Sequence, residues 1–260
     1  MVVQARFLLL LSILFIHGLA IASPRIAIII DDIGYQKSDL TMVALPYNLT
    51  MAVLPHTPYG RQAAQLAFTQ QKDVILHMPM EATNQNALGQ GALTQGMSRQ
   101  DIHHTLALAL ADIPYAIGIN NHMGSLFTAL DQPMSWTMEY LEQRQLFFID
   151  SLTTPKSTAK YYAAKHNVAL LARHVFLDNE QNQPAIERQF QQLIDIAKRH
   201  QTAIAIGHPY PETYRFLQQR LPQLAAEGVE LVTISALLPA THQVIAAGFT
   251  EPAGLHTQGK

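Results

Sequence analysis

Six side chains spread along the sequence could bind a metal ion or transfer protons. Each lies at or shortly after the end of a short apolar run, and they are Asp31, Asp32, His77, His122, Asp150 and His208. One carboxylate and two imidazoles suit Zn²⁺ and leave a coordination position open for water. Asp32, His77 and His122 form such a set. A structural hydrogen bond explains any one of these histidines equally well, but their joint occurrence after corresponding apolar runs favours a metal site.

Residues 26–35 (IAIIIDDIGY) combine an apolar run with two adjacent acids and a glycine. Five consecutive apolar residues predict a strand that is buried on both faces, as in a parallel sheet. Successive strand residues point to opposite faces, so Asp31 and Asp32 can serve one site only where the strand gives way to a loop, near Gly34. Adjacent acids leaving a buried strand require a cation, hydrogen bonds or a shared proton. The alternative is that one acid caps the next helix.

The same order of elements recurs along the chain: an apolar run, a polar or glycine-containing break, and a helical stretch. About eight such runs predict parallel β/α architecture, with residues 169–177 and 229–235 among the expected strands. Residues 83–96 predict a long loop, and Ser98 with Asp101 predicts a capped helix start. Nearly every run ends in Asp, His or Asn. A β/α barrel of about seven to eight parallel strands would bring these ends to one mouth, unlike an open sheet.

Composition excludes several classes of function. The chain of 260 residues is 48% hydrophobic and 14% charged, which supplies a sizeable core for one domain. Its formal net charge of -2 gives no reason to expect nucleic acid. No G-x-G-x-x-G follows the first strand and no P-loop motif occurs, so dinucleotide and P-loop nucleotide binding have no support. Without cysteine there is no disulfide, thiolate ligand or cysteine nucleophile.

Residues 1–22 differ from the remainder of the chain, with a basic start at Arg6, the apolar run FLLLLSILFI and a final Ala20-Ile21-Ala22. This pattern predicts a signal peptide cleaved after Ala22. An uncleaved membrane anchor is the alternative, although the run is shorter than the ~20 residues of a spanning helix. We expect residues 23–251 to form a single catalytic domain with a flexible tail at 252–260. The absence of cysteine favours the periplasm, without stable membrane insertion after cleavage.

Taken together, the motifs resemble the divergent polysaccharide deacetylases, which are relatives of the NodB-like carbohydrate esterases. The matching segments span nearly the whole mature chain: IIIDDIGY (28–35), LPHTPY (54–59), HMPMEA (77–82), GINNHMGS (118–125), FFIDS (147–151), ARHVFLDN (172–179) and IGHPYPET (206–213). The resemblance implies a distorted NodB-like (β/α) barrel and a divalent metal, with Zn²⁺ preferred. It further implies removal of acetyl groups from an N-acetylated glycan such as peptidoglycan-derived material, by hydrolysis of C–N amide bonds. No protein partner is indicated.

Carried over by position, the resemblance assigns Asp32, His77 and His122 to the metal. It makes Asp31 the catalytic base and His208 the acid that protonates the leaving amine. Two departures from classical NodB-like chains stand out. Their two histidines lie in one motif, whereas here they belong to two strand units, and their arginine-proline segment is replaced by NNHMGS (120–125).

Other residues at the expected mouth could position substrate or catalytic groups. A backbone N–H between Asn121 and Ser125 could stabilise the oxyanion. Asp150 could hold His208 or His122 in one tautomer. Arg173 could pair with Asp31 or Asp150, or form a plain structural ion pair.

His56 ends another strand and is an alternative site residue. Glu81 could bind substrate, or its charge could favour a helix N-terminus. His103 and His104 are expected at the surface, and Trp136 and Tyr140 in the core. Two other functions remain open: a catalytically silent barrel that binds glycan or an envelope protein, and a hydrolase of another acyl or phosphate bond.

Overall fold

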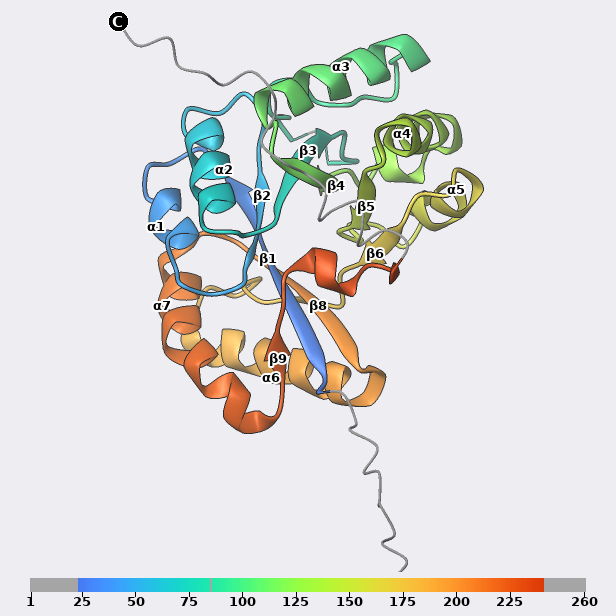
Figure 1. Cartoon of the computed structure of the whole chain (residues 1–260). Helices are drawn as coiled ribbons and strands as arrows, with labels where there is room; N and C mark the ends of the chain where they lie inside the picture. Colours follow the sequence, from blue (N-terminus) through green and yellow to red (C-terminus); the bar gives the residue numbers. More distant parts are fainter. Residues whose placement is uncertain (1–22, 85, 241–260) are drawn as a thin grey trace, which may run out of the picture.

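The computed structural model describes residues 23–84 and 86–240; the predicted signal peptide and the predicted tail lie outside these residues. The described strands pair in parallel in one curled sheet (Figure 1). Their order is β6-β5-β4-β3-β2-β1-β8-β7, and β9 pairs with β1. The strands are β1 Arg25–Ile33, β2 Thr50–Val53, β3 Val74–Met80, β4 Ala116–Met123, β5 Phe147–Asp150, β6 Leu170–Ala172, β7 Val175–Phe176, β8 Thr202–Gly207 and β9 Glu230–Leu231.

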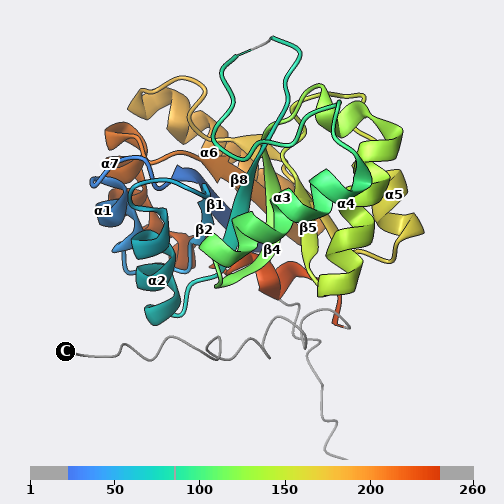
Figure 2. The same cartoon turned by 90° about the horizontal axis from the view of Figure 1, so that it is seen from above.

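Helices surround the outer face of this sheet (Figure 2). The α-helices are α1 Asp39–Val43, α2 Gly60–Thr69, α3 Arg99–Asp112, α4 Asp131–Arg144, α5 Ala159–Lys165, α6 Gln183–His200 and α7 Pro211–Arg220. The 3-10 helices are η1 Phe127–Ala129, η2 Leu221–Glu227 and η3 Ile234–Leu237. None of the helices in the described part of the chain has the length and apolar content to span a bilayer.

The isoleucines of β1 pack on both faces of the sheet. Ile26, Ile28 and Ile30 belong to the large hydrophobic cluster between the sheet and the helices. Ala27 and Ile29 belong to a second cluster, on the inner face of the curl. Two-sided burial explains why the strand is a continuous apolar run, as the sequence predicts.

The helix η3 covers the inner cluster where the strands begin. Its Ile234 is fully buried in that cluster. Residues at the starts of strands fix its backbone: Thr50 Oγ1 accepts the Ile234 N–H at 3.0 Å, and Asp73 Oδ2 accepts the Ser235 N–H at 2.7 Å. The prediction of a strand at 229–235 is therefore wrong beyond Leu231, because side chains of other elements take the backbone groups that a strand would pair.

The predicted strand at 169–177 is divided into β6 and β7, which lie at opposite ends of the strand order. Between them the chain crosses from one edge to the other: the Arg173 N–H donates to Asp150 O at 3.1 Å, and the His174 N–H donates to Ile204 O at 2.8 Å. The predicted distorted barrel of parallel strands is confirmed as a curled half-barrel. It is completed by this crossing segment and not by pairing of β6 with β7.

The helices α3 and α4 bear on two predictions. Ser98 and Asp101 form a reciprocal capping box at the start of α3, as their spacing predicts. Of the two histidines predicted at the surface, His104 is exposed, whereas His103 is half-buried, with its Nε2 3.0 Å from Trp136 O and its ring against Tyr140. His103 therefore contributes to the contact between the two helices.

The close approach of β4 to β5 gives a stability prediction. A Cβ on Gly118 would lie 2.4 Å from Cε2 of the buried Phe147 ring. Overpacking of this kind typically costs ~1–3 kcal/mol. We therefore expect Gly118→Ala to lower the free energy of unfolding in urea by about that amount. Gly96→Ala is the control, because nothing lies within 4 Å of its added Cβ, and similar losses in both variants would contradict this explanation.

Candidate metal centre and active site

Asp31 and Asp32 reach the same site because β1 is irregular where they lie. The pairing of β1 with β2 shifts register between Ile30 and Ile33, and Asp32 has a left-handed backbone with φ 59°. That conformation is uncommon outside glycine, and a bulge redirects side chains from the regular alternation. Two neighbouring carboxylates can therefore face one cluster, inside the strand and slightly before the predicted turn at Gly34.

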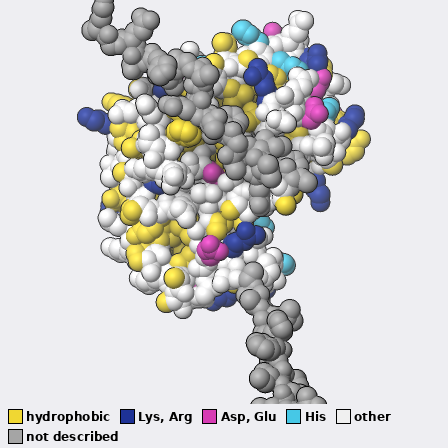
Figure 3. Space-filling model, viewed as in Figure 1, with side chains coloured by type: hydrophobic (Ala, Val, Ile, Leu, Met, Phe, Trp, Pro, Cys, Tyr) yellow, Lys and Arg dark blue, Asp and Glu magenta, His cyan; other side chains and the backbone are white. Residues whose placement is uncertain are grey.

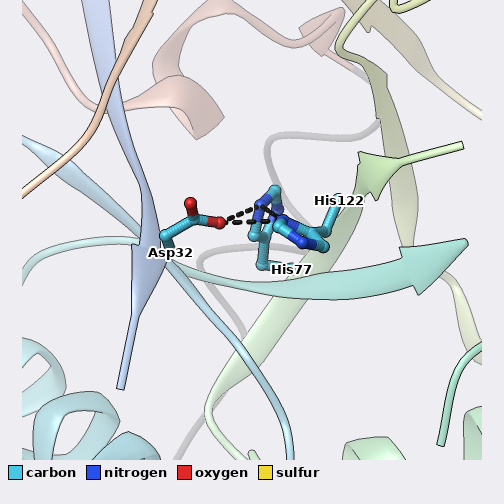
Figure 4. A group of neighbouring side chains, drawn as sticks. All are labelled: Asp32, His77 and His122. Atoms are coloured by element: carbon cyan, nitrogen blue, oxygen red, sulfur yellow. Dashed lines mark hydrogen bonds and ion pairs between the residues drawn. The ribbon is translucent and has the colours of Figure 1, made fainter. Parts of the chain in front are cut away.

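Asp32, His77 and His122 point toward one another from β1, β3 and β4 (Figure 4). Asp32 Oδ1 lies 3.1 Å from His77 Nε2 and 2.8 Å from His122 Nδ1. The two imidazole nitrogens are 3.1 Å apart. In the described residues this is the one group of potential metal ligands whose atoms all lie within 4.8 Å of one another. The structure thus brings together the three residues that the sequence nominates as ligands.

This donor set fits a tetrahedral divalent ion. Zn²⁺ bonds of ~2.0–2.2 Å separate neighbouring ligand atoms by about 3.3 Å, close to the edges of the triangle. Burial alone would raise the pKa of Asp32, but hydrogen bonds with His122 and His77 outweigh it and hold that pKa well below its ordinary value. The Asp32 side chain is 33% exposed, whereas His77 is 2% exposed. The group is therefore strongly anionic at Asp32 and open on one side.

Asn120 connects the proposed ligands to the second acid. The His77 Nδ1–H donates to Asn120 Oδ1 at 2.8 Å, and Asn120 Nδ2 donates to Asp31 Oδ1 at 2.8 Å. The first bond directs His77 Nε2 toward Asp32, as outer partners of metal-binding histidines do. Asn120 is not among the site residues predicted from the sequence. Its position could have indicated this role, because Asn120 and His122 are two residues apart on β4 and so share a face.

Asp31 lies behind the ligand group and is 3% exposed. Its Oδ2 is 3.7 Å from His77 Nε2. Burial raises the pKa of Asp31, although the nearby His77 and His208 oppose the rise. A carboxylate with a raised pKa is a stronger proton acceptor. This environment therefore suits the predicted role of Asp31 as the catalytic base.

His208 faces the cluster from the end of β8, with Nε2 4.0 Å from Asp32 Oδ2. Its Nδ1 lies 2.8 Å from Asp178 Oδ1, and its backbone N–H donates to Asp178 Oδ2 at 2.6 Å. Burial lowers the pKa of His208, but the hydrogen bond with Asp178 outweighs it and raises the pKa to about 9. His208 is therefore an imidazolium at neutral pH and can donate a proton.

The prediction that Asp150 holds His208 or His122 is wrong. Asp150 Oδ1 accepts the Leu152 N–H at 2.8 Å, and Oδ2 accepts the Ser157 hydroxyl at 2.6 Å. Its carboxylate organises the loop after β5. The residue that holds His208 is Asp178. It lies next to His208 because the strand beside β8 is β7, which Asp178 follows, and not β6.

Arg173 forms no ion pair with either predicted acid in the described part of the chain. It donates from Nε to Ser151 O at 2.8 Å and from Nη2 to Leu152 O at 3.2 Å. Its guanidinium lies over the Phe176 ring, 3.8 Å from the centroid. These bonds tie the end of β5 to the segment that crosses the open side of the sheet, so the side chain supports closure of the half-barrel.

The side chains of Asn121 and Ser125 hold loops near the cluster. Asn121 Oδ1 accepts the Ser151 N–H at 2.9 Å, and its Nδ2 donates to Met123 O at 2.7 Å. Ser125 Oγ accepts the Thr83 N–H at 3.0 Å. Stabilisation of an oxyanion by a backbone N–H in this segment stays a prediction.

Glu81 and His56 border the 83–96 loop, which extends beyond the helices in Figure 2. Glu81 Oε2 accepts the Gln95 N–H at 2.7 Å. The His56 backbone N–H donates to Asp112 Oδ2 at 2.7 Å, and its ring lies beside Gly91. Neither residue belongs to the triangle of Asp32, His77 and His122, and contact with substrate stays a prediction for both.

Residues 28–238 match the family model for divergent polysaccharide deacetylases. This chain belongs to that family. An uncharacterised protein of Haemophilus influenzae is 40% identical over 217 residues, which are 83% of this chain and 77% of that protein. The uncharacterised protein YibQ of Escherichia coli K12 is 39% identical over 225 residues, or 85% of this chain and 70% of YibQ.

Solved structures share the fold of this member of the family. An uncharacterised protein from Agrobacterium tumefaciens C58 has a TM-score of 0.79 at 23% identity, covering 84% of this chain and 90% of its own. A CE4 family pseudoenzyme from Bacillus anthracis has a TM-score of 0.52 at 11% identity, covering 83% of this chain and 65% of its own. At these identities the likeness concerns the fold alone.

The contact between His208 and Asp178 predicts a measurable pKa. In Asp178→Asn the main cause of the raised pKa is lost, so we expect the pKa of His208 to fall from about 9 toward its ordinary value of ~6.5. Titration of the imidazole signals by NMR measures this. In the wild type, the associated stability is present below pH ~6.5 and is lost as pH rises through about 9. The stability of Asp178→Asn should change little as the pH rises through this interval.

Asp150→Asn is the matched control for this titration, because Asp150 bonds the loop after β5 and not His208. It should leave the pKa of His208 raised. Equal shifts in the two variants, or no shift in Asp178→Asn, would contradict the assignment of Asp178.

Proposed function

We propose that this protein is a metal-dependent hydrolase that removes acetyl groups from an N-acetylated glycan of the cell envelope. The observation that carries the proposal is the arrangement around Asp32. Its carboxylate lies between two imidazole ligands, with the buried Asp31 behind them and the cationic His208 at 4.0 Å. A base and an acid thus flank one metal-binding group, which is the arrangement that amide hydrolysis requires.

Asp32, His77 and His122 would hold the ion, with Zn²⁺ preferred for two imidazoles and one carboxylate. When bound, the ion would supply Lewis-acid polarisation of the acyl oxygen and a lowered pKa for water. Asn120 keeps His77 in the tautomer that presents Nε2. It also holds the carboxylate of Asp31 in place.

Asp31 accepts the proton of the water that attacks the acetyl carbon. His208 donates the proton on Nε2 to the nitrogen of the leaving amine, so the C–N bond breaks to give neutral amine and acetic acid, which ionises to acetate on release into water at neutral pH. Asp178 keeps His208 charged before this transfer. The two proton transfers use different residues, so neither group has to reverse its role within one hydrolysis.

The family name supports a glycan substrate, and peptidoglycan-derived material is the class that a cell-envelope location would offer. The leader-like residues 1–22 support export across the inner membrane to the periplasm. Expression with these residues fused to a reporter that functions only after export tests the location separately from the activity.

Acetate release tests the activity. We expect the protein to release acetate from chitooligosaccharides or peptidoglycan fragments, with loss of release after chelation and recovery with Zn²⁺. Asp31→Asn should lower kcat by about 10²-fold or more, because the base is lost, while Zn²⁺ remains bound. Asp195→Asn, an exposed acid on α6, is the control and should retain full activity.

The outcomes separate the alternatives. Zn²⁺ binding without acetate release from any glycan would support a silent barrel that binds glycan or an envelope protein. Hydrolysis of esters or phosphate compounds, without acetate release from any glycan, would support a hydrolase of another acyl or phosphate bond. A wild type that binds no divalent ion would refute the proposed role of the cluster.

Metal affinity tests the contribution of Asn120 without any substrate. Asn120→Ala removes the bond that orients His77, so we expect Zn²⁺ to bind about 10–100-fold more weakly, measured by competition with a chromogenic chelator. His122→Ala removes a proposed ligand and should weaken binding more. An Asn120→Ala protein with wild-type affinity would show that Asn120 does not orient the ligand.

A further inference from the structure

A cavity lies at the other end of the strands from the proposed metal site, between α3, α4 and the starts of β4 and β5. Its volume is about 350 Å³. Two alanines of α3, Ala107 and Ala111, leave the space, and the larger apolar side chains at its wall are Leu110, Ile113, Pro114 and Leu146. Figure 3 shows hydrophobic side chains over α3 and α4, with basic, acidic and histidine side chains among them. The cavity is separate from the metal-binding group, because β4 begins here and carries His122 at its far end.

Tyr140 contributes an incompletely bonded polar atom to this apolar wall. The residue is 5% exposed, and its hydroxyl makes no hydrogen bond of regular geometry with the described residues. Its polar neighbour is the Arg144 side chain, which opposes the rise in pKa that burial of the hydroxyl causes. A buried tyrosine hydroxyl normally has a well-formed hydrogen bond, since leaving one unpaired costs free energy. The incompletely bonded hydroxyl is an observation independent of the cavity volume, and it indicates a ligand that carries a polar group.

Arg144 places a positive charge at the rim, one turn after Tyr140 on α4. It is exposed, and its guanidinium lies 5.4 Å from the centroid of the Tyr140 ring. It forms no ion pair within the described part of the chain, and no acidic side chain lines the cavity. The cavity is therefore apolar, and its polar groups are the Arg144 guanidinium and the neighbouring Tyr140 hydroxyl. Such a site is complementary to an amphiphile with an anionic head group.

We propose that this cavity binds a single-chain aliphatic carboxylate, with its alkyl chain between α3 and α4 and its carboxylate at Arg144 and Tyr140. At ~30 Å³ for each non-hydrogen atom, the volume holds about a dozen such atoms, which corresponds to a chain of about ten carbons. A guanidinium and a hydroxyl can both donate to one carboxylate. The site is distinct from the proposed catalytic centre and does not depend on its activity.

Tryptophan fluorescence offers a direct test, because Trp136 is the one tryptophan of the sequence and precedes Tyr140 by one turn of α4. We expect ω-bromodecanoate to quench it saturably in the full mature chain. Arg144→Gln removes a charged hydrogen bond and should raise the Kd about tenfold or more. Arg188→Gln, an exposed arginine on α6, is the charge-matched control and should leave Kd unchanged.

Two more variants separate a ligand site from a packing defect. Ala111→Leu fills the slot and should abolish saturable quenching. Tyr140→Phe removes the incompletely bonded hydroxyl, so it should raise the Tm of the ligand-free protein while weakening bromodecanoate binding. A Tm that falls in Tyr140→Phe would show that the hydroxyl already has a well-formed hydrogen bond, and would overturn the inference.

The nature of the head group is tested with the bromoalcohol of the same length, which should bind at least tenfold more weakly. Equal binding of the alcohol, or absence of saturable quenching by the carboxylate, would refute the proposal. Binding to vesicles of anionic phospholipid without binding of bromodecanoate would also refute it, because the occupant would then be a lipid surface. All measurements are made without glycan or added metal, so their failure leaves the proposed hydrolase untouched.

Discussion

Two adjacent carboxylates at the end of one buried strand are the constraint on which the active-site architecture depends. The negative charges of two neighbouring carboxylates repel each other, and burial removes the water that would screen this repulsion. The protein compensates them separately: Asp32 faces His77 and His122, and Asp31 accepts from the buried Asn120. The distortion of β1 makes this division possible, because a regular strand would send the two acids to opposite faces.

The parallel sheet supplies the compensating groups from several strands. His77, Asn120 and His122 come from β3 and β4, and His208 comes from the end of β8 on the other side of β1. Each group is carried by a strand whose apolar residues pack on both faces of the sheet. The spacing of the cluster is thereby set by strand pairing, which is far stiffer than a loop. The N-terminal ends of the strands carry none of the cluster residues, and η3 covers the inner face of the sheet there.

Patterns along the sequence predict the elements and the three proposed ligands, because both depend on local information. Strands follow from continuous apolar runs, and polar residues after those runs in a parallel sheet must lie at one end of it. The partner of His208 could not be found in this way. Asp150 and Asp178 both follow a strand, and the choice between them depends on which strand lies beside β8. That neighbour is β7, and β7 is separated from β6 by a crossing of two residues that reads in the sequence as part of one apolar run. Lateral order is a property of the whole fold, so residues 169–177 alone do not reveal it.

The pKa values of the proposed acid and base are shifted by different physical causes. Burial raises the pKa of Asp31, and the nearby His77 and His208 oppose this rise because they favour the anion. Asp178 raises the pKa of His208 to about 9, above neutrality. Because Asp31 contributes to the raised pKa of His208, and His208 opposes the rise at Asp31, each group favours the charged form of the other. The contacts that compensate the buried charges therefore also place the proposed base and acid near the same three potential metal ligands.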